Sequence, residues 1–223
     1  MEIIAKALAE GRKMLSEYES KQVLAAYGVP VTREILVRTR EEAAAAAGEI
    51  GYPLVVKGCS SEIAHKTEQG LIVTGVRDEA DAIEAFDRII GPVSRTGGGV
   101  LIQEMISGKR ELVAGMTRDP QFGPSVMFGL GGIFTEILRD VSFRVAPLEK
   151  RDALEMMDEI KGRKILDAVR GMPAADRESL ANILVGVGRI GLDHQAVLEI
   201  DINPIILAGS APVAVDALIV LGR

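Results

Sequence analysis

Polar and apolar positions alternate along Glu199–Pro204, where acid or amide side chains are separated by isoleucines. Successive side chains of a strand point to opposite faces, so the segment predicts a strand with Glu199, Asp201 and Asn203 on one face and both isoleucines on the other. Three oxygen-bearing side chains on one face suit a hard cation such as Mg²⁺, which is usually shared with substrate phosphates. The segment alone leaves a half-buried strand with a solvated outer face equally open.

The rest of the chain predicts a mixed succession of helices and strands. Capping-box patterns at Ser16 with Glu19 and at Thr39 with Glu42 open two helices, and Asp78 caps a third. The expected helices are 16–28, 39–51, 78–90, 149–160 and 174–190. The expected strands are 32–37, 53–57, 71–76, 100–105, 111–118, 124–129, 141–145, 199–204 and 213–216. This mixture is typical of an α/β or α+β protein.

The pattern also indicates a division into two parts. A chain of 223 residues can form one large domain or two small ones. Several strand-like runs follow Ser107–Gly108, whereas helices and strands are interspersed before it. We therefore expect two subdomains, residues 1–106 and residues 107–223.

Composition narrows the class of partner and the compartment. A formal net charge of −6 argues against nucleic acid as a partner, and no uninterrupted apolar run is long enough to span a bilayer. The segment Met1–Arg12 lacks the apolar core of a secretory signal. The single cysteine, Cys59, excludes an internal disulfide and suits a reducing environment. We expect a cytoplasmic protein.

Candidate chemistry in the first half centres on basic side chains. Lys57 ends an apolar strand, where it either binds phosphate or is simply solvated. His65 precedes Lys66 in a polar loop, and an imidazole there can act as base, ligand or nucleophile, or be merely exposed. Glu104 and Met105 end a strand at the proposed boundary, where backbone groups could meet a planar ligand.

In the second half, glycines and further polar residues indicate an anion site. Gly131 and Gly132 follow a strand, and glycine lets backbone amides approach an anion closely. Arg144 adds a guanidinium fork for phosphoryl oxygens, although a tight turn explains the glycines equally well. If the strand ending at Asp216 pairs with the acidic strand, Asp216 lies beside Asn203 and both can bind one cation.

Taken together, these motifs resemble the ATP-grasp fold, and more narrowly the β subunit of ADP-forming acyl-CoA synthetases, relatives of succinyl-CoA synthetase. The resemblance covers about Leu15 to Leu221. Its most specific stretches are Pro53–Gly70 and Phe128–Leu148. It implies two α+β subdomains with a nucleotide between them.

The resemblance also implies roles for individual residues. Lys57 and Lys66 would hold ATP phosphates, with Glu104 and Met105 at the adenine edge. Glu111 would hold the ribose, and Asn203 and Asp216 would bind Mg²⁺ with Asp201 close by. A histidine at the place of His65 accepts a phosphoryl group and relays it between a phosphohistidine of a CoA-binding α subunit and ADP. That subunit is the implied partner, in an α₂β₂ assembly.

One departure from the family pattern and two rival functions remain at this point. The family has a second glycine after the His-Lys motif, where this chain has Leu71.

A carboxylate–amine or carboxylate–thiol ligase on the same fold would need no phosphohistidine. A non-catalytic nucleotide-binding subunit is the other alternative, and the acid substrate and the choice of ADP or GDP stay open.

Overall fold

The computed structural model describes residues 1–62, 70–132 and 140–222, and their strands form two sheets. The residues group into two compact units. The larger unit contains Met1–Leu15, Glu19–Val31 and Ile106–Arg223, and the smaller unit contains Ser16–Tyr18 and Thr32–Met105. The strand pairs described in both sheets are antiparallel, so of the two expected classes the chain has the α+β one.

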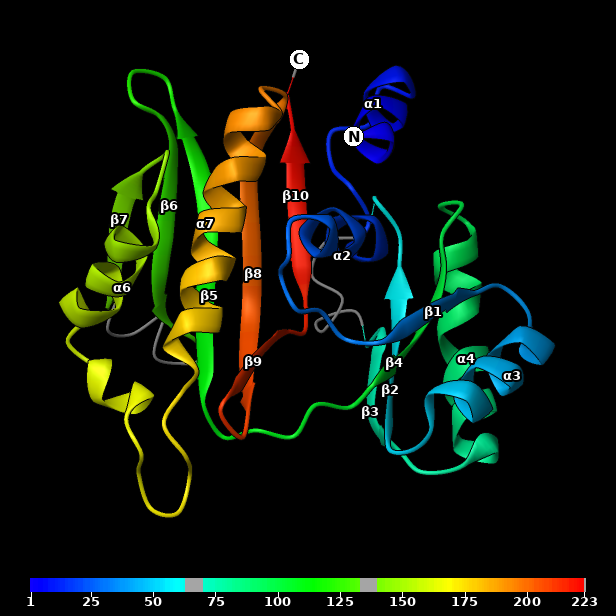
Figure 1. Ribbon diagram of the computed structural model, residues 1–223. Helices are drawn as coiled ribbons and strands as arrows, with labels where there is room; N and C mark the ends of the chain where they lie inside the picture. The colour runs from blue at the N-terminus through cyan, green and yellow to red at the C-terminus, as the bar shows by residue number, and fades with distance from the viewer. Residues whose placement is uncertain (63–69, 133–139, 223) are drawn as a thin grey trace. The chain divides into compact units, whose positions relative to one another are not determined.

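The smaller unit is a four-stranded sheet in the order β1-β4-β2-β3, with helices α3 and α4 on one face (Figure 1). Its elements are β1 (Glu34–Val37), α3 (Arg40–Ile50), β2 (Leu54–Cys59), β3 (Ile72–Val76), α4 (Glu79–Ser94) and β4 (Gly99–Glu104). Leu54 and Val56 of β2 pack into the core under the helices, together with Val100 and Ile102 of β4. Because side chains alternate along a strand, Lys57 belongs to the opposite face of β2.

Two of the predicted helix starts in this unit are confirmed, and one predicted end is wrong. The capping box between Thr39 and Glu42 is present at the start of α3, and Asp78 accepts a hydrogen bond from the Asp81 amide. Helix α4 does not stop at residue 90 but continues through Pro92 to Ser94. The last turn forms because it buries Val93 completely against the sheet core.

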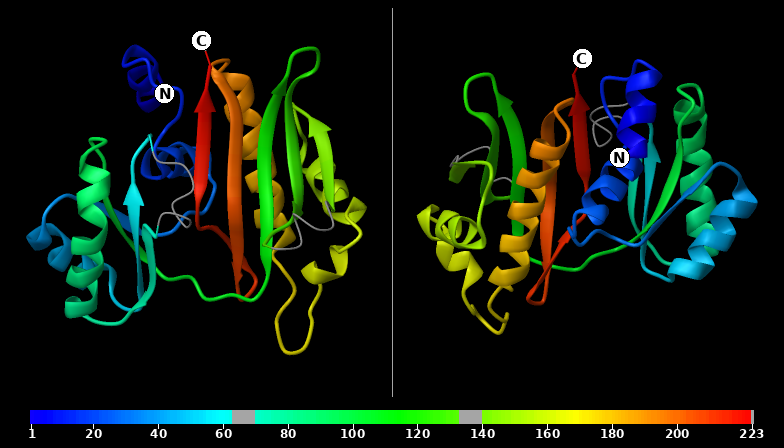
Figure 2. Two further views of the ribbon diagram at one scale, coloured as in Figure 1. Left: turned by 180° about the vertical axis from the view of Figure 1, so that it is seen from behind. Right: turned by 45° about the horizontal axis from the view of Figure 1, so that its top comes forward.

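The larger unit is a six-stranded sheet in the order β10-β8-β5-β6-β7, with β9 also paired to β8. Helices α6 and α7 cover one face of it (Figure 2). Its elements are α1 (Glu2–Ala9), most of α2 (Glu17–Ala26), β5 (Glu111–Asp119), β6 (Gly123–Leu130), β7 (Val141–Val145), α6 (Lys150–Glu159), the 3₁₀ helix η1 (Arg163–Leu166), α7 (Arg177–Asp193), β8 (Val197–Ala208), β9 (Ala211–Ala214) and β10 (Ala217–Leu221).

The N-terminal helices belong to the larger unit, which differs from the expected division at residue 106. Ile4 of α1 and Leu24 of α2 lie in the core cluster of the larger unit, as does Leu15 between the two helices. Helix α1 was not expected from the sequence. The division of the chain therefore follows the burial of these apolar side chains rather than their order along the chain.

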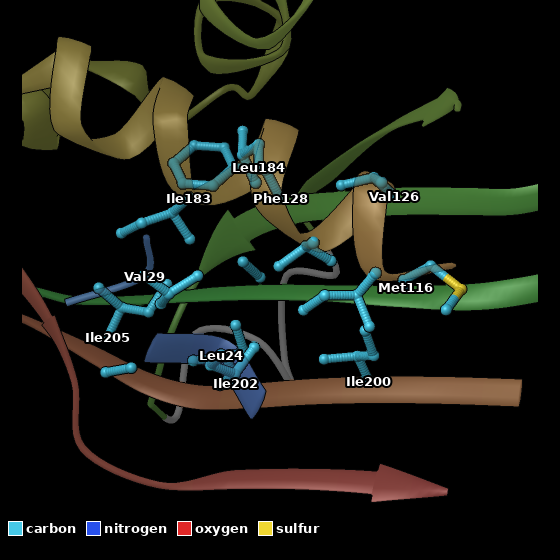
Figure 3. Close-up of a cluster of buried hydrophobic side chains, with 14 of the residues drawn as sticks. Leu24, Val29, Met116, Val126, Phe128, Ile183, Leu184, Ile200, Ile202 and Ile205 are labelled. Atoms are coloured by element: carbon cyan, nitrogen blue, oxygen red, sulfur yellow. The ribbon is translucent and has the colours of Figure 1, made fainter. Parts of the chain in front are cut away.

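The core of the larger unit shows which face of its sheet packs against α7. Figure 3 shows side chains of β5, β6 and β8 meeting Ile183 and Leu184 of α7. Ile200 and Ile202 are among them and are almost fully buried. The residues that alternate with them point to the other face of the sheet, called the open face below.

Candidate functional site

The acidic strand is β8, and its predicted alternation is confirmed. Ile200 and Ile202 face α7, while Glu199 is exposed and Asp201 half-buried on the open face. Asn203 continues this series and is exposed. Burial of the isoleucines fixes the register of the strand, so these three polar side chains are held on one face by the packing behind them.

Asp216 lies beside this series, as expected, but not within a strand. Strand β9 ends at Ala214 and β10 begins at Ala217, which pairs with Ile202 of β8. Asp216 therefore occupies the connection at the level of Asn203. Its Oδ1 accepts a hydrogen bond of 2.8 Å from the Ala217 amide, which fixes the carboxylate at the start of β10.

The pKa of Asp201 is affected by its burial and by the neighbouring carboxylates. Burial, followed by the negative charges of Glu199 and Asp216, raises the pKa of Asp201 to about 6. A divalent cation would offset both causes, since it supplies positive charge where carboxylates are partly removed from water. Within the described ranges, no three His, Cys, Asp or Glu side chains form a metal site by themselves. Mg²⁺ is commonly held by one or two carboxylates together with substrate phosphates, and this donor set fits that chemistry.

Strands β5 and β8 approach each other closely beside Asp201, a feature that sequence reasoning missed. Gly115 is the residue directly opposite Asp201 in the ladder between β5 and β8. A Cβ atom at this position would lie 2.6 Å from the backbone oxygen of Ile200, so no larger residue fits without moving the strands. The signal in the sequence was a glycine inside an otherwise apolar strand, which indicates close backbone approach.

The glycine loop and Glu111 are brought together. Gly131 donates a 2.8 Å hydrogen bond to the backbone oxygen of Glu111, and a Cβ atom at Gly131 would lie 2.8 Å from the Glu111 carbonyl carbon. Gly132 has a φ of +64°, and its missing Cβ leaves the Glu111 carboxylate unobstructed. The loop thus ends β6 against the first residue of β5.

Arg144 is not brought to the open face, which corrects its expected role as a phosphate ligand. Arg144 of β7 lies directly opposite Val126 of β6 in the strand ladder. Residues that lie opposite each other point to the same face of the sheet. The Val126 side chain lies in the core beneath α7, so Arg144 is on the helix side. Its guanidinium donates to both carboxylate oxygens of Glu159 on α6, at 3.0 and 2.5 Å. This ion pair raises the pKa of Arg144 and lowers that of Glu159.

In the smaller unit, Lys57 is buried and paired with an acid. Its Nζ lies 2.8 Å from Oε1 of Glu17, and the side chains of Lys57 and Glu17 are only 5% and 2% exposed. The structure therefore excludes the solvated strand end that the sequence left open.

The two residues expected at the adenine edge also have protein partners. Glu104 accepts hydrogen bonds from the backbone amide and the Nε of Arg33 at 2.8 and 2.9 Å. The Met105 amide donates to the backbone oxygen of Pro53 at 3.2 Å, and its side chain is 38% exposed. These bonds fix the end of β4 and the start of the connection to β5.

The loop motif itself is only partly described. His65 and Lys66 lie outside the described residues. Leu71, at the position where the resemblance implied a second glycine, is buried in the core of the smaller unit, and its carbonyl accepts a hydrogen bond from the Gly58 amide at 2.8 Å. The positive φ of +67° falls on Gly70, so leucine at 71 serves packing.

Comparison with known proteins assigns the family. The ATP-grasp domain family matches residues 6–221, and the chain therefore belongs to the ATP-grasp family, in the group of ADP-forming acetate–CoA ligase β subunits. It is 47% identical over 225 residues to the β subunit of acetate–CoA ligase (ADP-forming) I from Pyrococcus furiosus, across 99% of this chain and 97% of that subunit. It is 42% identical to acetate–CoA ligase (ADP-forming) I from Archaeoglobus fulgidus, across all of this chain but 33% of that protein.

A solved structure gives the same assignment. Acetyl-coenzyme A synthetase 1 of Ca. Korarchaeum cryptofilum matches 99% of this chain with 41% identity and a TM-score of 0.88. That protein was solved with coenzyme A and Mg-AMPPCP, and its phosphohistidine segment points towards its nucleotide binding site. The family resemblance seen in the sequence is confirmed.

Separately, no helix in the described ranges is both long and apolar enough to cross a lipid bilayer.

Proposed function

We propose that this chain is the nucleotide-binding β subunit of an ADP-forming acyl-CoA synthetase. The overall reaction converts acyl-CoA, phosphate and ADP to the free acid, CoA and ATP. One observation supports the proposal: Asp201 and Asn203 lie on the face of β8 that alternates with the buried isoleucines, and Asp216 comes just before Ala217, which pairs with Ile202 of β8. This arrangement occurs in a chain that matches a ligase β subunit over nearly its full length.

The chain's own residues suit the binding of a magnesium nucleotide. Asp201, Asn203 and Asp216 would hold Mg²⁺, which when bound neutralises charge on the phosphoryl oxygens. Lys57 would contact the phosphates as a buried cation, and Glu111 would accept from the ribose hydroxyls. Glycine at 131 and 132 leaves the backbone and the Glu111 carboxylate free of side-chain obstruction.

His65 would carry the phosphoryl group. A ring nitrogen of the neutral imidazole attacks the γ-phosphorus of ATP, and the new N–P bond replaces the bond from that phosphorus to the β-phosphate oxygen. ADP leaves and the imidazole loses its ring proton to solvent, so charge and atoms balance. Lys66 and Lys57 would stabilise the negative charge on the transferring group. The reverse sequence makes ATP.

The rest of the reaction requires a second protein. The P. furiosus relative is a β subunit, and the name of that protein implies an α partner. We place the CoA and acyl sites on such an α subunit, which would also carry the other phosphohistidine, in an α₂β₂ assembly. Acid specificity would then lie outside this chain.

Phosphoryl transfer to the purified chain tests the proposal. After incubation with γ-³²P-labelled ATP and Mg²⁺, we expect acid-labile, base-stable label on the protein. His65→Ala should abolish the label. The chain contains only two histidines, so His194→Ala is a matched control that should label like the wild type.

The outcomes separate the possible functions. If His65→Ala labels as strongly as the wild type while folded, the relay assignment is wrong. If the wild type binds ATP but takes no label, alone or with a CoA-binding subunit, a ligase that uses a free acyl phosphate or a non-catalytic subunit replaces the proposal.

A further inference from the structure

Strand β8 changes its alternation in the middle of the candidate cation site. Ile200 and Ile202 lie in the core two residues apart, but the next core residue, Ile205, follows after three (Figure 3). A regular strand returns to the same face at every second residue. Asn203 and Pro204 therefore lie together between two core positions, where a regular strand has only one residue.

Towards β5, the extra residue of β8 shifts the register of the ladder. Ile202 pairs with Ala114 of β5. Ile205 pairs with Leu112, so Val113 alone faces two residues of β8. This is a β-bulge, which bends a strand and changes the direction of a side chain, and bulges are frequent beside active sites.

Towards β9 and β10, the register does not shift, because the chain on that side also has an extra residue. Ile205 pairs with Ala214, the last residue of β9. Ile202 pairs with Ala217, the first residue of β10. Ala214 and Ala217 both lie in the core although they are three residues apart. Each of the two segments thus has two residues between its core positions.

This match places the expected cation ligands opposite each other. Between the two pairs of core residues, Asn203 is opposite Asp216 and Pro204 is opposite Val215. The Val215 amide donates a hydrogen bond of 3.0 Å to the backbone oxygen of Pro204, which joins the two segments at this level. Residues opposite each other in a ladder point to the same face of the sheet.

We infer that Pro204 and Val215 are a matched pair of positioning residues, which keep Asn203 opposite Asp216 so that both reach one cation. This rests on the proposed function, in which Asn203 and Asp216 hold Mg²⁺. If either extra residue were missing, one residue would face two across this ladder. The alignment of Asn203 with Asp216 and the hydrogen bond between Val215 and Pro204 would then be lost.

Calorimetric titration of the full chain with ATP, in Mg²⁺ and separately in EDTA, tests the inference. Deletion of Pro204 leaves Ile202 and Ile205 two positions apart, so the apolar side chains keep their face. We expect the Kd for ATP in Mg²⁺ to rise by about ten-fold or more, and the Kd in EDTA to change by less than about two-fold. A merely structural role would change both values.

Deletion of Val215 should weaken binding in Mg²⁺ to a similar extent, and deletion of both residues should restore it. The double deletion leaves one residue on each side between the same core pairs, so Asn203 again faces Asp216. We expect it to bind ATP in Mg²⁺ at least about three-fold more tightly than either single deletion. Deletion of Gln121, from the exposed turn between β5 and β6, is the matched control and should leave the Kd within about two-fold of the wild type.

Two results would overturn the inference: wild-type affinity in Mg²⁺ after deletion of Pro204, or a double deletion that binds no better than the single ones. If circular dichroism shows the single deletions unfolded, Val215→Pro replaces them, because it removes the amide donor at full chain length. Val215→Ala keeps that amide and is its control. We expect Val215→Pro to bind ATP in Mg²⁺ at least about three-fold more weakly than Val215→Ala, and equal affinities would refute the inference.

Failure of the proposed function gives a different result. A wild-type chain whose affinity for ATP does not depend on Mg²⁺ would contradict the cation site itself. Variants that behave like a Mg²⁺-dependent wild type would contradict only the positioning by Pro204 and Val215.

Discussion

The half-buried carboxylate of Asp201, close to the negative charges of Glu199 and Asp216, predicts that Asp201→Asn stabilises the metal-free protein at neutral and alkaline pH. The pKa of Asp201 is raised from 3.8 to about 6 by burial and by Glu199 and Asp216. The folded state therefore binds this proton more tightly than the unfolded chain does. The free energy of unfolding therefore falls as the pH rises from about 4 to about 6, and above that range it stays lowered by the full amount.

The magnitude follows from the same pKa. The rise in the pKa of Asp201 from 3.8 to about 6 corresponds to about 3 kcal/mol of stability, at 1.36 kcal/mol per pKa unit. Asparagine is neutral but still needs hydrogen-bond partners when half-buried, so we expect a gain of about 1–2 kcal/mol at pH 8. At pH 5 most of Asp201 is already protonated in the folded state, and the gain should fall below half of that value.

Urea unfolding followed by circular dichroism, with a chelator present, measures this effect at both pH values. Glu199→Gln is the comparison, because Glu199 is exposed on the same face of the same strand and its change should be smaller. If Asp201→Asn lowers the free energy of unfolding at pH 8, or changes it equally at pH 5 and pH 8, the electrostatic reasoning about this site is refuted.

Three further substitutions, and a fourth as a control, test the packing and hydrogen bonding of the fold by the same unfolding assay. Thr39→Ala removes the capping box of α3 and should cost about 1 kcal/mol; no change would contradict the cap. Arg110→Met removes a buried guanidinium that donates to four backbone carbonyl groups, and should cost more than about 3 kcal/mol; a loss below about 1 kcal/mol would show that water replaces it. Gly131→Ala places a Cβ atom 2.8 Å from the Glu111 backbone and should cost about 2 kcal/mol. Gly48→Ala, in a helix with open space around it, should instead add about 0.5–1 kcal/mol, and equal effects of these two glycine changes would contradict the packing account.

Local periodicity was enough to predict the acidic strand. Ile200 and Ile202 repeat at the period of a strand, and their burial determines the face on which Asp201 lies. The helix caps at Thr39 and Asp78 were equally predictable from local sequence. Each cap depends only on a side chain that accepts a hydrogen bond from the amide three residues later.

Features that depend on contacts distant along the sequence could not be predicted in the same way. Glu17 meets Lys57 across 40 residues of sequence, and Gly115 faces Asp201 only through the register of two strands. The expectation for Arg144 came from the chemistry of its guanidinium, which says nothing about the face of the strand. In β7, Phe143 is 56% exposed, while Arg144 lies on the helix side of the sheet and pairs with Glu159.

Under the proposed function, this chain is the nucleotide-binding half of a two-protein enzyme. ATP formation from acetyl-CoA, phosphate and ADP with Mg²⁺ tests this most directly, when it is measured for the chain alone, for a CoA-binding subunit from the same genome alone, and for their mixture. We expect ATP from the mixture only, and none when His65→Ala replaces the wild type. ATP formation that persists with His65→Ala, or a mixture that forms a complex but makes no ATP from any acyl-CoA tested, would contradict it.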